Sequence, residues 1–305
     1  MTGGDTTPRS EEGELRVRSV RSILYISPVL AVLIGFFLLP SSIFFLYSFG
    51  TGAVYRVQPI FTLGNYIQVL TNQTYLRVTL NALSIGGLSA TASILVSYLL
   101  AYYLTFRLKR GRNLALFLVV LSLLSSYLVR VYAWKTILGL NGVVNSFLEW
   151  AGVIEAPLET LLYSRLAVTI TLMNVFIPFA MLPILSSLQN IQPELIEAAK
   201  DLGCTPLRAF VKVTLPLSMT GVLSGFMYTF ILSAGDYITP QLVGGTSGSM
   251  IGQSIANQFV KTGNWPLGSA ISFTALSMFM AIYFGARWAV KALKVAPPPP
   301  PEYSG

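Results

Sequence analysis

The chain alternates long apolar runs with short polar connections. A helix needs about 20 mostly apolar residues to cross the hydrocarbon core of a bilayer, which is roughly 30 Å thick. The first run is too long for a signal-peptide core and has no small-residue cleavage site behind it, so we expect it to remain as a span. The pattern predicts an all-α, polytopic membrane protein with six transmembrane helices, at residues 22–49, 78–106, 113–136, 161–188, 216–243 and 267–290.

The connection before the fifth run is the most polar interior stretch of the chain. Residues 193–216 read PELIEAAKDLGCTPLRAFVKVTLP and carry six charged side chains. Proline favours the first position of a helix and glycine the position after its end, so Pro193 and Gly203 predict a short helix between them. A second short helix is expected at 206–213, and Pro216 then begins the fifth span.

Both predicted helices are amphipathic, and such helices could lie on lipid headgroups. Membrane-surface helices prefer bulky apolar anchors, whereas a pair of alanines favours close packing against protein. Contact with another protein is therefore the favoured interpretation. The residues that share an apolar face are Leu195, Ala198, Ala199 and Leu202 in the first helix and Leu207, Phe210 and Val211 in the second.

Composition excludes several classes of protein. Charged residues make up 10% of the 305 residues, against about 25% in a soluble domain, and 53% are hydrophobic. The chain has no histidine and one cysteine, Cys204, which excludes disulfide frameworks, Cys/His zinc sites and histidine-based catalysis. We therefore expect no catalytic residue and no metal site.

The net charge of +8 could suggest nucleic acid, but the positions of the charges indicate membrane orientation instead. Fourteen of the 20 Lys and Arg residues fall in four segments: the N-terminal tail, 107–112, 193–216 and the C-terminal end. The alternate connections are poor in basic residues, and 138–160 carries three glutamates. The positive-inside rule places both termini and the polar stretch in the cytoplasm, and no nucleic-acid partner is expected.

Three regions are expected along the chain. Residues 1–20 are polar and predict a disordered cytoplasmic tail. Residues 21–292 form the transmembrane domain, with a cytoplasmic connection at 189–216 that we name the charged loop. Residues 293–305 are a Pro-rich tail, expected to be an unstructured end of polyproline II character, for which a ligand of a recognition domain is the alternative.

The charged loop contains a motif with a defined spacing. It reads Glu-Ala-Ala, three residues, Gly, nine residues, an aliphatic residue, one residue and Leu-Pro. This motif resembles the loop signature of permease subunits of ATP-binding cassette (ABC) importers, with valine in place of the usual isoleucine. The matching positions are Glu197, Ala198, Ala199, Gly203, Val213, Leu215 and Pro216.

The rest of the chain, from about residue 20 to 290, resembles the spermidine/putrescine branch of that family in the stretches 61–70, 79–104, 130–145 and 233–245. The resemblance implies the type I ABC importer permease fold. It also implies that the charged loop is the coupling element, which docks in a groove of a separate ATP-hydrolysing subunit. The residues that would take part in this coupling are Glu197, Ala198, Ala199, Gly203, Leu207, Arg208, Phe210 and Pro216.

The sequence contains no phosphate-binding loop of the form Gly-x-x-x-x-Gly-Lys-[Ser/Thr], and the glycine-rich stretch 244–250 lacks the lysine. We therefore expect a protein that is not an enzyme and binds no cofactor itself, with ATP and Mg²⁺ used by partner subunits. The resemblance implies a multi-pass subunit of a bacterial inner membrane, in contact with lipid. Its implied partners are two ABC ATPase subunits, a second, non-identical permease and an extracytoplasmic substrate-binding protein.

Two other classes of protein stay open. Ion-coupled carriers commonly place ionisable residues inside their spans. Here the strongest intramembrane acid, Asp236, has no partner acid or histidine in the predicted spans, which disfavours a proton relay. A structural or assembly subunit is the second alternative.

Polar residues within the predicted spans are candidates for a substrate path. Asp236 would attract a cationic substrate, or it pairs with an arginine or caps a helix broken at Gly235. Arg130 would hold a substrate carboxylate, or it lies in an interfacial aromatic belt. Buried amides more often join helices than bind substrate. The candidates are Asp236, Tyr237, Arg130, Trp134, Asn81 and Asn174.

Branch resemblance and the carboxylate of Asp236 make polyamine the leading substrate class. An amino-acid-like compound, or another small organic solute, is the alternative. It follows from a possible pairing of an amine with Asp236 and a carboxylate with Arg130.

Overall fold

The computed structural model describes residues 27–292 apart from 54–55, 59 and 109. The tails expected at 1–20 and 293–305 lie outside the described residues.

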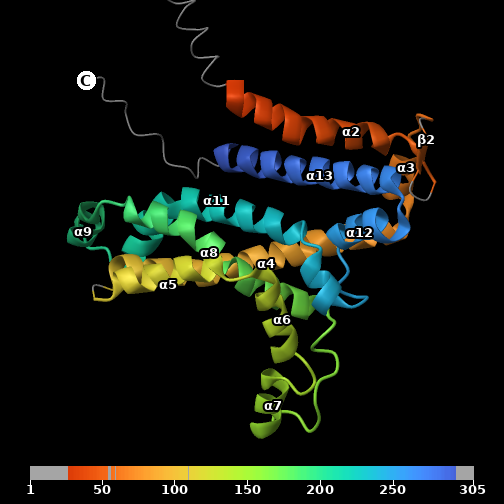
Figure 1. Cartoon of the computed structure of the whole chain (residues 1–305). Coiled ribbons are helices and arrows are strands. Elements are labelled where there is room, and N and C mark those ends of the chain that lie inside the picture. Colours follow the sequence, from red (N-terminus) through yellow and green to blue (C-terminus); the bar gives the residue numbers. More distant parts are fainter. Residues whose placement is uncertain (1–26, 54–55, 59, 109, 293–305) are drawn as a thin grey trace, which may run out of the picture.

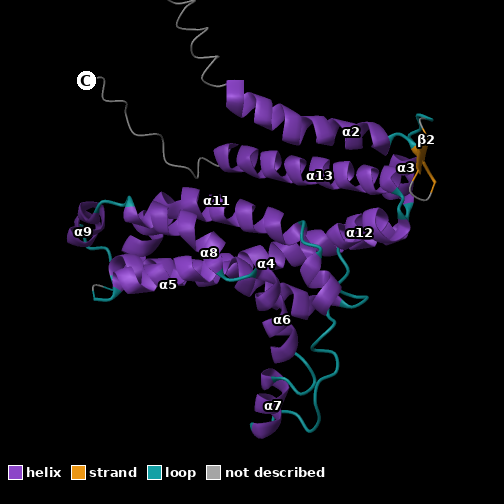
Figure 2. Cartoon of the chain, in the orientation of Figure 1, coloured by secondary structure: helices purple, strands orange, loops and turns teal. Residues whose placement is uncertain are grey.

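Within the described residues the chain is mostly helical, with one short hairpin (Figure 2). Strands β1 (Thr51–Ala53) and β2 (Arg56–Gln58) pair antiparallel, with Gly52 opposite Val57. The helices are α2 (Leu39–Ser48), α3 (Gly64–Thr71), α4 (Gln73–Phe106), α5 (Arg112–Leu124), α6 (Tyr127–Ile137), α7 (Val143–Trp150), α8 (Arg165–Gln189), α9 (Pro193–Asp201), α10 (Pro206–Ala209), α11 (Leu215–Ala234), α12 (Ile251–Asn257) and α13 (Trp265–Ala292). Short π-helical segments adjoin them: η1 (Ile34–Leu38), η2 (Phe210–Thr214), η3 (Pro240–Gly244) and η4 (Gln258–Thr262).

Three long helices form the centre of the bundle. α4, α8 and α11 pack against one another, and they contribute most of the buried side chains (Figure 1). α2 packs on α13, and this pair forms a second layer on one side of the centre (Figure 1). α6 and α7 project away on the opposite side, and α9 lies at one end of the bundle (Figure 1).

The six predicted spans are approximately supported. Five helices of the described chain are long and apolar enough to cross a membrane. A sixth span requires α5 and α6 together, and these are bent by 94° at Ser125 and Ser126. The continuous helix predicted for 113–136 is therefore wrong. Both serines have extended backbone, with ψ of 136° and 131°, and serine competes with the backbone bonds that would continue a helix.

The boundaries predicted for the fifth span, 216–243, are also wrong. The continuous helix runs from Pro206 to Ala234, through α10, η2 and α11. Proline lacks the N–H that an α-helix needs, yet the helix continues through Pro216. A wider turn precedes it, in which the N–H of Leu215 bonds to the carbonyl of Phe210 five residues back. The second short helix predicted at 206–213 is thus the beginning of the fifth span.

A regular row of hydrogen bonds joins α4 to α8. Ser89, Ser93 and Ser97 are fully buried and lie four residues apart, on one face of α4. Their hydroxyls donate to three α8 carbonyls, also spaced four residues apart, at 3.2, 3.0 and 2.8 Å. Small side chains let the two backbones approach, and the bonds satisfy the hydroxyls in an apolar surrounding.

Removing this row should weaken the bundle. A bond of this kind contributes about 0.6 kcal/mol in membrane proteins, so Ser93→Ala should have a small effect and a triple change to alanine should cost about 2 kcal/mol. Unfolding of the purified chain by SDS measures the difference. Thr91→Ala is the control, because the exposed Thr91 hydroxyl bonds within its own helix, to the carbonyl of Gly87. An unchanged unfolding midpoint in the triple variant would contradict the assignment.

Two glycines allow α11 to pack closely against α8. A Cβ atom at Gly221 would meet the side chain of Ser187 and would lie 2.5 Å from the carbonyl oxygen of Pro183. A Cβ atom at Gly225 would lie 3.0 Å from the carbonyl oxygen of Ala180. The spacing of four residues places both glycines on the same face of α11, as in other close helix pairs of membranes.

Candidate functional site

The charged loop lies at one end of the bundle, where α9 leaves α8 (Figure 1). Gly203 follows α9 with a φ of +83°, a conformation that glycine adopts without steric cost. The N–H of Gly203 bonds to the carbonyl of Lys200 at 2.8 Å, and that of Cys204 to the carbonyl of Ala199 at 3.0 Å. This pair of bonds is a Schellman motif, which ends α9 and turns the chain sharply toward α10.

The outward face of the charged loop is apolar and exposed. Leu202 and Leu207 are 87% and 72% exposed, and Leu195 is 46% exposed. The charged side chains of Glu197 and Arg208 are exposed on the same loop. Large apolar side chains exposed beside charges are typical of a surface that another protein covers.

Phe210 faces the other way, toward the spans. Its ring meets those of Tyr98 and Tyr102 on α4 edge-on, with centroids 5.9 and 5.4 Å apart. The single stripe predicted for Leu207, Phe210 and Val211 is therefore wrong, since Leu207 and Val211 are exposed while Phe210 is partly buried. The wider turn of η2 changes the register after α10. The charged loop thus contacts α4 directly and continues into α11.

Two helix breaks, one between α5 and α6 and one after α11, are joined by a hydrogen bond. The break between α5 and α6 is followed by Tyr127, and the break after α11 by Thr239, and their hydroxyls are hydrogen-bonded at 2.7 Å. The carboxylate of Asp236 accepts the N–H of Ile238 at 3.3 Å and that of Thr239 at 2.9 Å. This geometry matches the capping interpretation of Asp236, because each of its oxygens holds a backbone N–H of the broken segment.

Arg130 lies close to this junction without pairing with Asp236. Its guanidinium donates to the carbonyl of Val175 on α8 at 2.9 Å and, at the longer distance of 3.5 Å, to that of Ser125. Within the described part of the chain no ion pair joins Arg130 to a carboxylate. The charge therefore holds the bent helix α6 against α8 and stays partly exposed.

The other candidates have different surroundings. Trp134 donates its indole N–H to the side chain of Asn174 at 3.0 Å, which links α6 to an exposed position on α8. Asn81 donates to the carbonyls of Ser247 and Ser249, both at 3.0 Å, and so joins α4 to the glycine-rich stretch. Tyr237 is 46% exposed.

The structure thus gathers some of the predicted residues and adds others. Arg130 and Trp134 both contact α8, and Asp236 caps the adjacent break, while Asn81 bonds to the glycine-rich stretch instead. Tyr127 and Thr239 were not predicted from the sequence, although they join the two breaks. The pair Ser125–Ser126 in an apolar run was the signal that could have located one of these breaks. In the described residues no three Cys, Asp or Glu side chains gather as a metal site would require.

Helices long enough to cross a membrane, an exposed apolar loop at one end of the bundle and two helix breaks joined by a hydrogen bond fit a membrane protein that contacts partner proteins. The chain belongs to the family of binding-protein-dependent transport system inner membrane components, which matches residues 14–294. It is therefore a permease subunit of an ABC importer, a transport component of the inner membrane, and the resemblance of the chain to this family is confirmed. Family membership also decides against the ion-coupled carrier.

The chain is similar to named permeases over most of its length. It is 32% identical to the spermidine/putrescine transport system permease protein PotB of Escherichia coli over 237 residues, which cover 78% of this chain and 85% of that protein. It is 34% identical to PotB of Haemophilus influenzae over 252 residues, covering 82% and 87%. The expected type I fold is confirmed by a bacterial ABC transporter involved in the import of alginate, with a TM-score of 0.75 at 18% identity, covering 93% of this chain and 99% of that chain.

Proposed function

We propose that this permease forms the path by which a polyamine, a spermidine- or putrescine-like cation, enters the cell. The observation that carries the proposal is the identity of 32–34% to spermidine/putrescine permeases across at least 78% of this chain. The solved alginate importer supports the fold alone, because it is 18% identical. An amino-acid-like or other small organic solute is the alternative, since a partly exposed Arg130 could hold a carboxylate.

The transporter would assemble with two ABC ATPase subunits, a second and non-identical permease, and an extracytoplasmic substrate-binding protein. The exposed apolar face of the charged loop supports docking of an ATPase subunit, which would use ATP and Mg²⁺. The four basic segments of the sequence support an orientation with both termini and the charged loop in the cytoplasm.

Asp236 would supply a fixed negative charge to the path. Its two backbone hydrogen bonds hold the carboxylate in place, and the residue is partly exposed. Tyr127 and Thr239 would keep the two helix breaks together beside it. Tyr237, Arg130, Trp134 and Asn174 would line the same region at its borders.

Uptake measurements test the substrate class. The chain is expressed together with its ATPase, second permease and binding protein in cells that lack polyamine uptake. We expect ATP-dependent accumulation of radiolabelled spermidine or putrescine that excess amino acid does not compete away. Uptake of an amino acid without polyamine uptake would favour the alternative.

Asp236→Asn distinguishes the negative charge of Asp236 from its role as a helix cap. The asparagine side chain keeps one oxygen that can accept a backbone N–H, but it removes the negative charge. We expect the KM for polyamine uptake to rise about tenfold, because a charge-assisted contact with a cation is lost. The amount of protein in the membrane should stay unchanged.

Glu155→Gln is the matched control, since it removes an exposed acid from the connection between α7 and α8. It should leave uptake as it is. If Asp236→Asn transports polyamine with the KM and rate of the unchanged chain, Asp236 acts as a helix cap and has no substrate role.

A further inference from the structure

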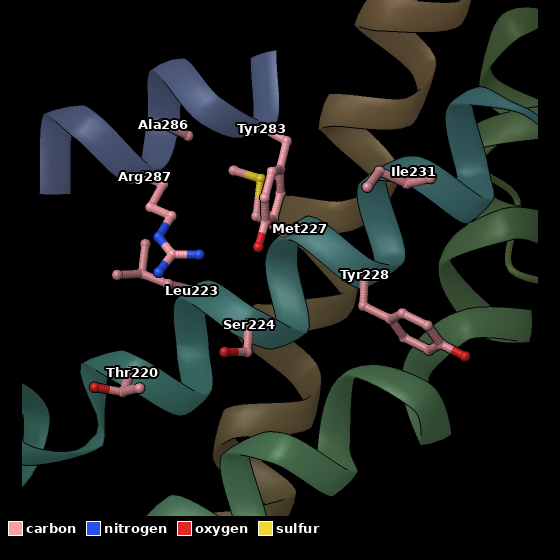
Figure 3. Close-up of a pocket in the computed structure, with 9 residues that line it drawn as sticks. All are labelled: Thr220, Leu223, Ser224, Met227, Tyr228, Ile231, Tyr283, Ala286 and Arg287. Atoms are coloured by element: carbon pink, nitrogen blue, oxygen red, sulfur yellow. The ribbon is translucent and has the colours of Figure 1, made fainter. Parts of the chain in front are cut away.

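A cleft of about 480 Å³ separates α11 from α13 (Figure 3). On the α11 side its wall is mainly apolar, with Leu223, Met227 and Ile231, and Ser224 lies between them. From α13, Tyr283 and Arg287 extend toward α11 (Figure 3).

The cleft closes where the two helices touch. Phe279 of α13 packs edge-on against Phe230 of α11, with ring centroids 6.2 Å apart. From this contact the cleft extends toward Thr220, close to the start of α11, and toward Arg287 on α13. It therefore lies in the half of the bundle next to the charged loop, which η2 joins to α11.

Arg287 brings a positive charge to the end of an apolar wall. The side chain is exposed, and no ion pair with any described carboxylate is present. Arg287 follows Trp265, the first residue of α13, by 22 residues. At 1.5 Å per residue this is about 33 Å, close to the thickness of the hydrocarbon core, so a span that begins at Trp265 brings Arg287 to the headgroups of the opposite side.

We propose that this cleft binds an anionic phospholipid of the leaflet next to the charged loop. The phosphate of the headgroup binds Arg287, with the hydroxyl of Tyr283 beside it, and an acyl chain lies along Leu223, Met227 and Ile231. An unpaired cation at headgroup depth attracts phosphate, and basic pockets between spans on the cytoplasmic side bind such headgroups. The proposal rests on the orientation proposed above.

The apolar wall of the cleft favours a lipid over a soluble anion as the ligand. A free phosphate would use Arg287 alone and leave Leu223 and Met227 facing the cleft uncovered. A lipid covers the wall and neutralises the charge together, so the two parts of the cleft serve one ligand.

Lipid retention tests the proposal. The full chain, alone and with its partner subunits, is placed in nanodiscs of phosphatidylcholine with phosphatidylglycerol, and retained lipid is read by native mass spectrometry after transfer to detergent. Arg287→Gln removes the charge, and Ser224→Trp fills the cleft from α11. Each should retain about tenfold less phosphatidylglycerol than the unchanged chain.

Two matched controls lie outside the cleft. Arg110→Gln removes an exposed charge from the connection before α5, and Leu114→Trp adds an indole at an exposed position of α5. Both should retain phosphatidylglycerol as the unchanged chain does. Since Arg287 is exposed, its substitution is a test that does not depend on whether the larger Ser224→Trp side chain is tolerated.

Three results would overturn the proposal. They are equal retention in Arg287→Gln and the unchanged chain, displacement of the lipid by millimolar inorganic phosphate, and efficient cross-linking of Ser224→Cys to the second permease in the assembled transporter. A reporter fused to the C-terminus reads orientation separately, and retention is measured without substrate. Failure of the lipid site is therefore distinguishable from failure of the proposed transport function.

Discussion

Gly203→Val should abolish most uptake while the protein still reaches the membrane. Gly203 has a φ of +83°, and a β-branched residue there is strained by about 1–3 kcal/mol. A Cβ atom at this position would meet nothing within 4 Å, so the backbone conformation, and not a clash, sets the cost. Loss of the Schellman motif would shift Leu202 and Leu207 relative to each other and disrupt the apolar face. We expect uptake to fall by about one to two orders of magnitude.

Gly203→Asn is the matched control, because asparagine tolerates positive φ better than other side chains. It should keep most of the uptake. ATP hydrolysis by the assembled transporter, with and without binding protein, is measured in parallel. A Gly203→Val transporter that works as well as Gly203→Asn would contradict the role of this turn in coupling.

Glu197→Lys tests whether the exposed face of the charged loop binds the ATPase subunit. Glu197 is exposed on α9, so reversing its charge should leave the fold unchanged and weaken docking of the ATPase subunit. Co-purification of that subunit is the measurement. Unchanged assembly and uptake in this variant would contradict the coupling assignment.

Gly221→Ala should destabilise the bundle through a clash between α11 and α8. Its Cβ would meet the side chain of Ser187 and lie 2.5 Å from the carbonyl oxygen of Pro183. The carbonyl belongs to the backbone of α8 and cannot move aside as the end of a side chain can. Overpacking of this kind costs about 1–3 kcal/mol, and Gly221→Val should cost more still.

Gly87→Ala is the matched control, because Gly87 is also helical and a Cβ there would meet nothing within 4 Å. Both changes gain the same helix propensity, about 1 kcal/mol, so their difference isolates packing. The SDS unfolding midpoint and the yield of folded protein are measured for both. If the Gly221→Ala variant is as stable as the Gly87→Ala variant, close packing of α11 on α8 at Gly221 is contradicted.

The local structure of the charged loop up to Gly203 was predicted well from the sequence. Pro193 favours a helix start through its fixed φ, and the bonds that end α9 at Gly203 and Cys204 reach at most five positions back, so their pattern can be interpreted without knowing the fold. The prediction for Phe210 was wrong because a π-turn changes the register after α10. The contact of Phe210 with Tyr102 also joins residues more than 100 positions apart, which a local pattern cannot show.

The substrate-path candidates show a different limit. Asp236 and Arg130 were found because a charge inside an apolar run is conspicuous. Their partners are backbone groups, the N–H of Thr239 and the carbonyl of Val175, and no residue type marks a backbone group in a sequence. Tyr127 was missed for a related reason, since a tyrosine in a span is unremarkable until its hydroxyl meets Thr239.

The sequence by itself determined the number of apolar runs, the position of the charged loop and the family resemblance. It could do so because crossing a bilayer sets a minimum apolar length, and because helix ends depend on neighbouring residues. Tertiary structure alone decided the 94° bend after α5, the serine bonds from α4 to α8 and the cleft beside Arg287. These features depend on which helix faces which, and hydropathy measures how apolar a residue is without specifying its neighbour.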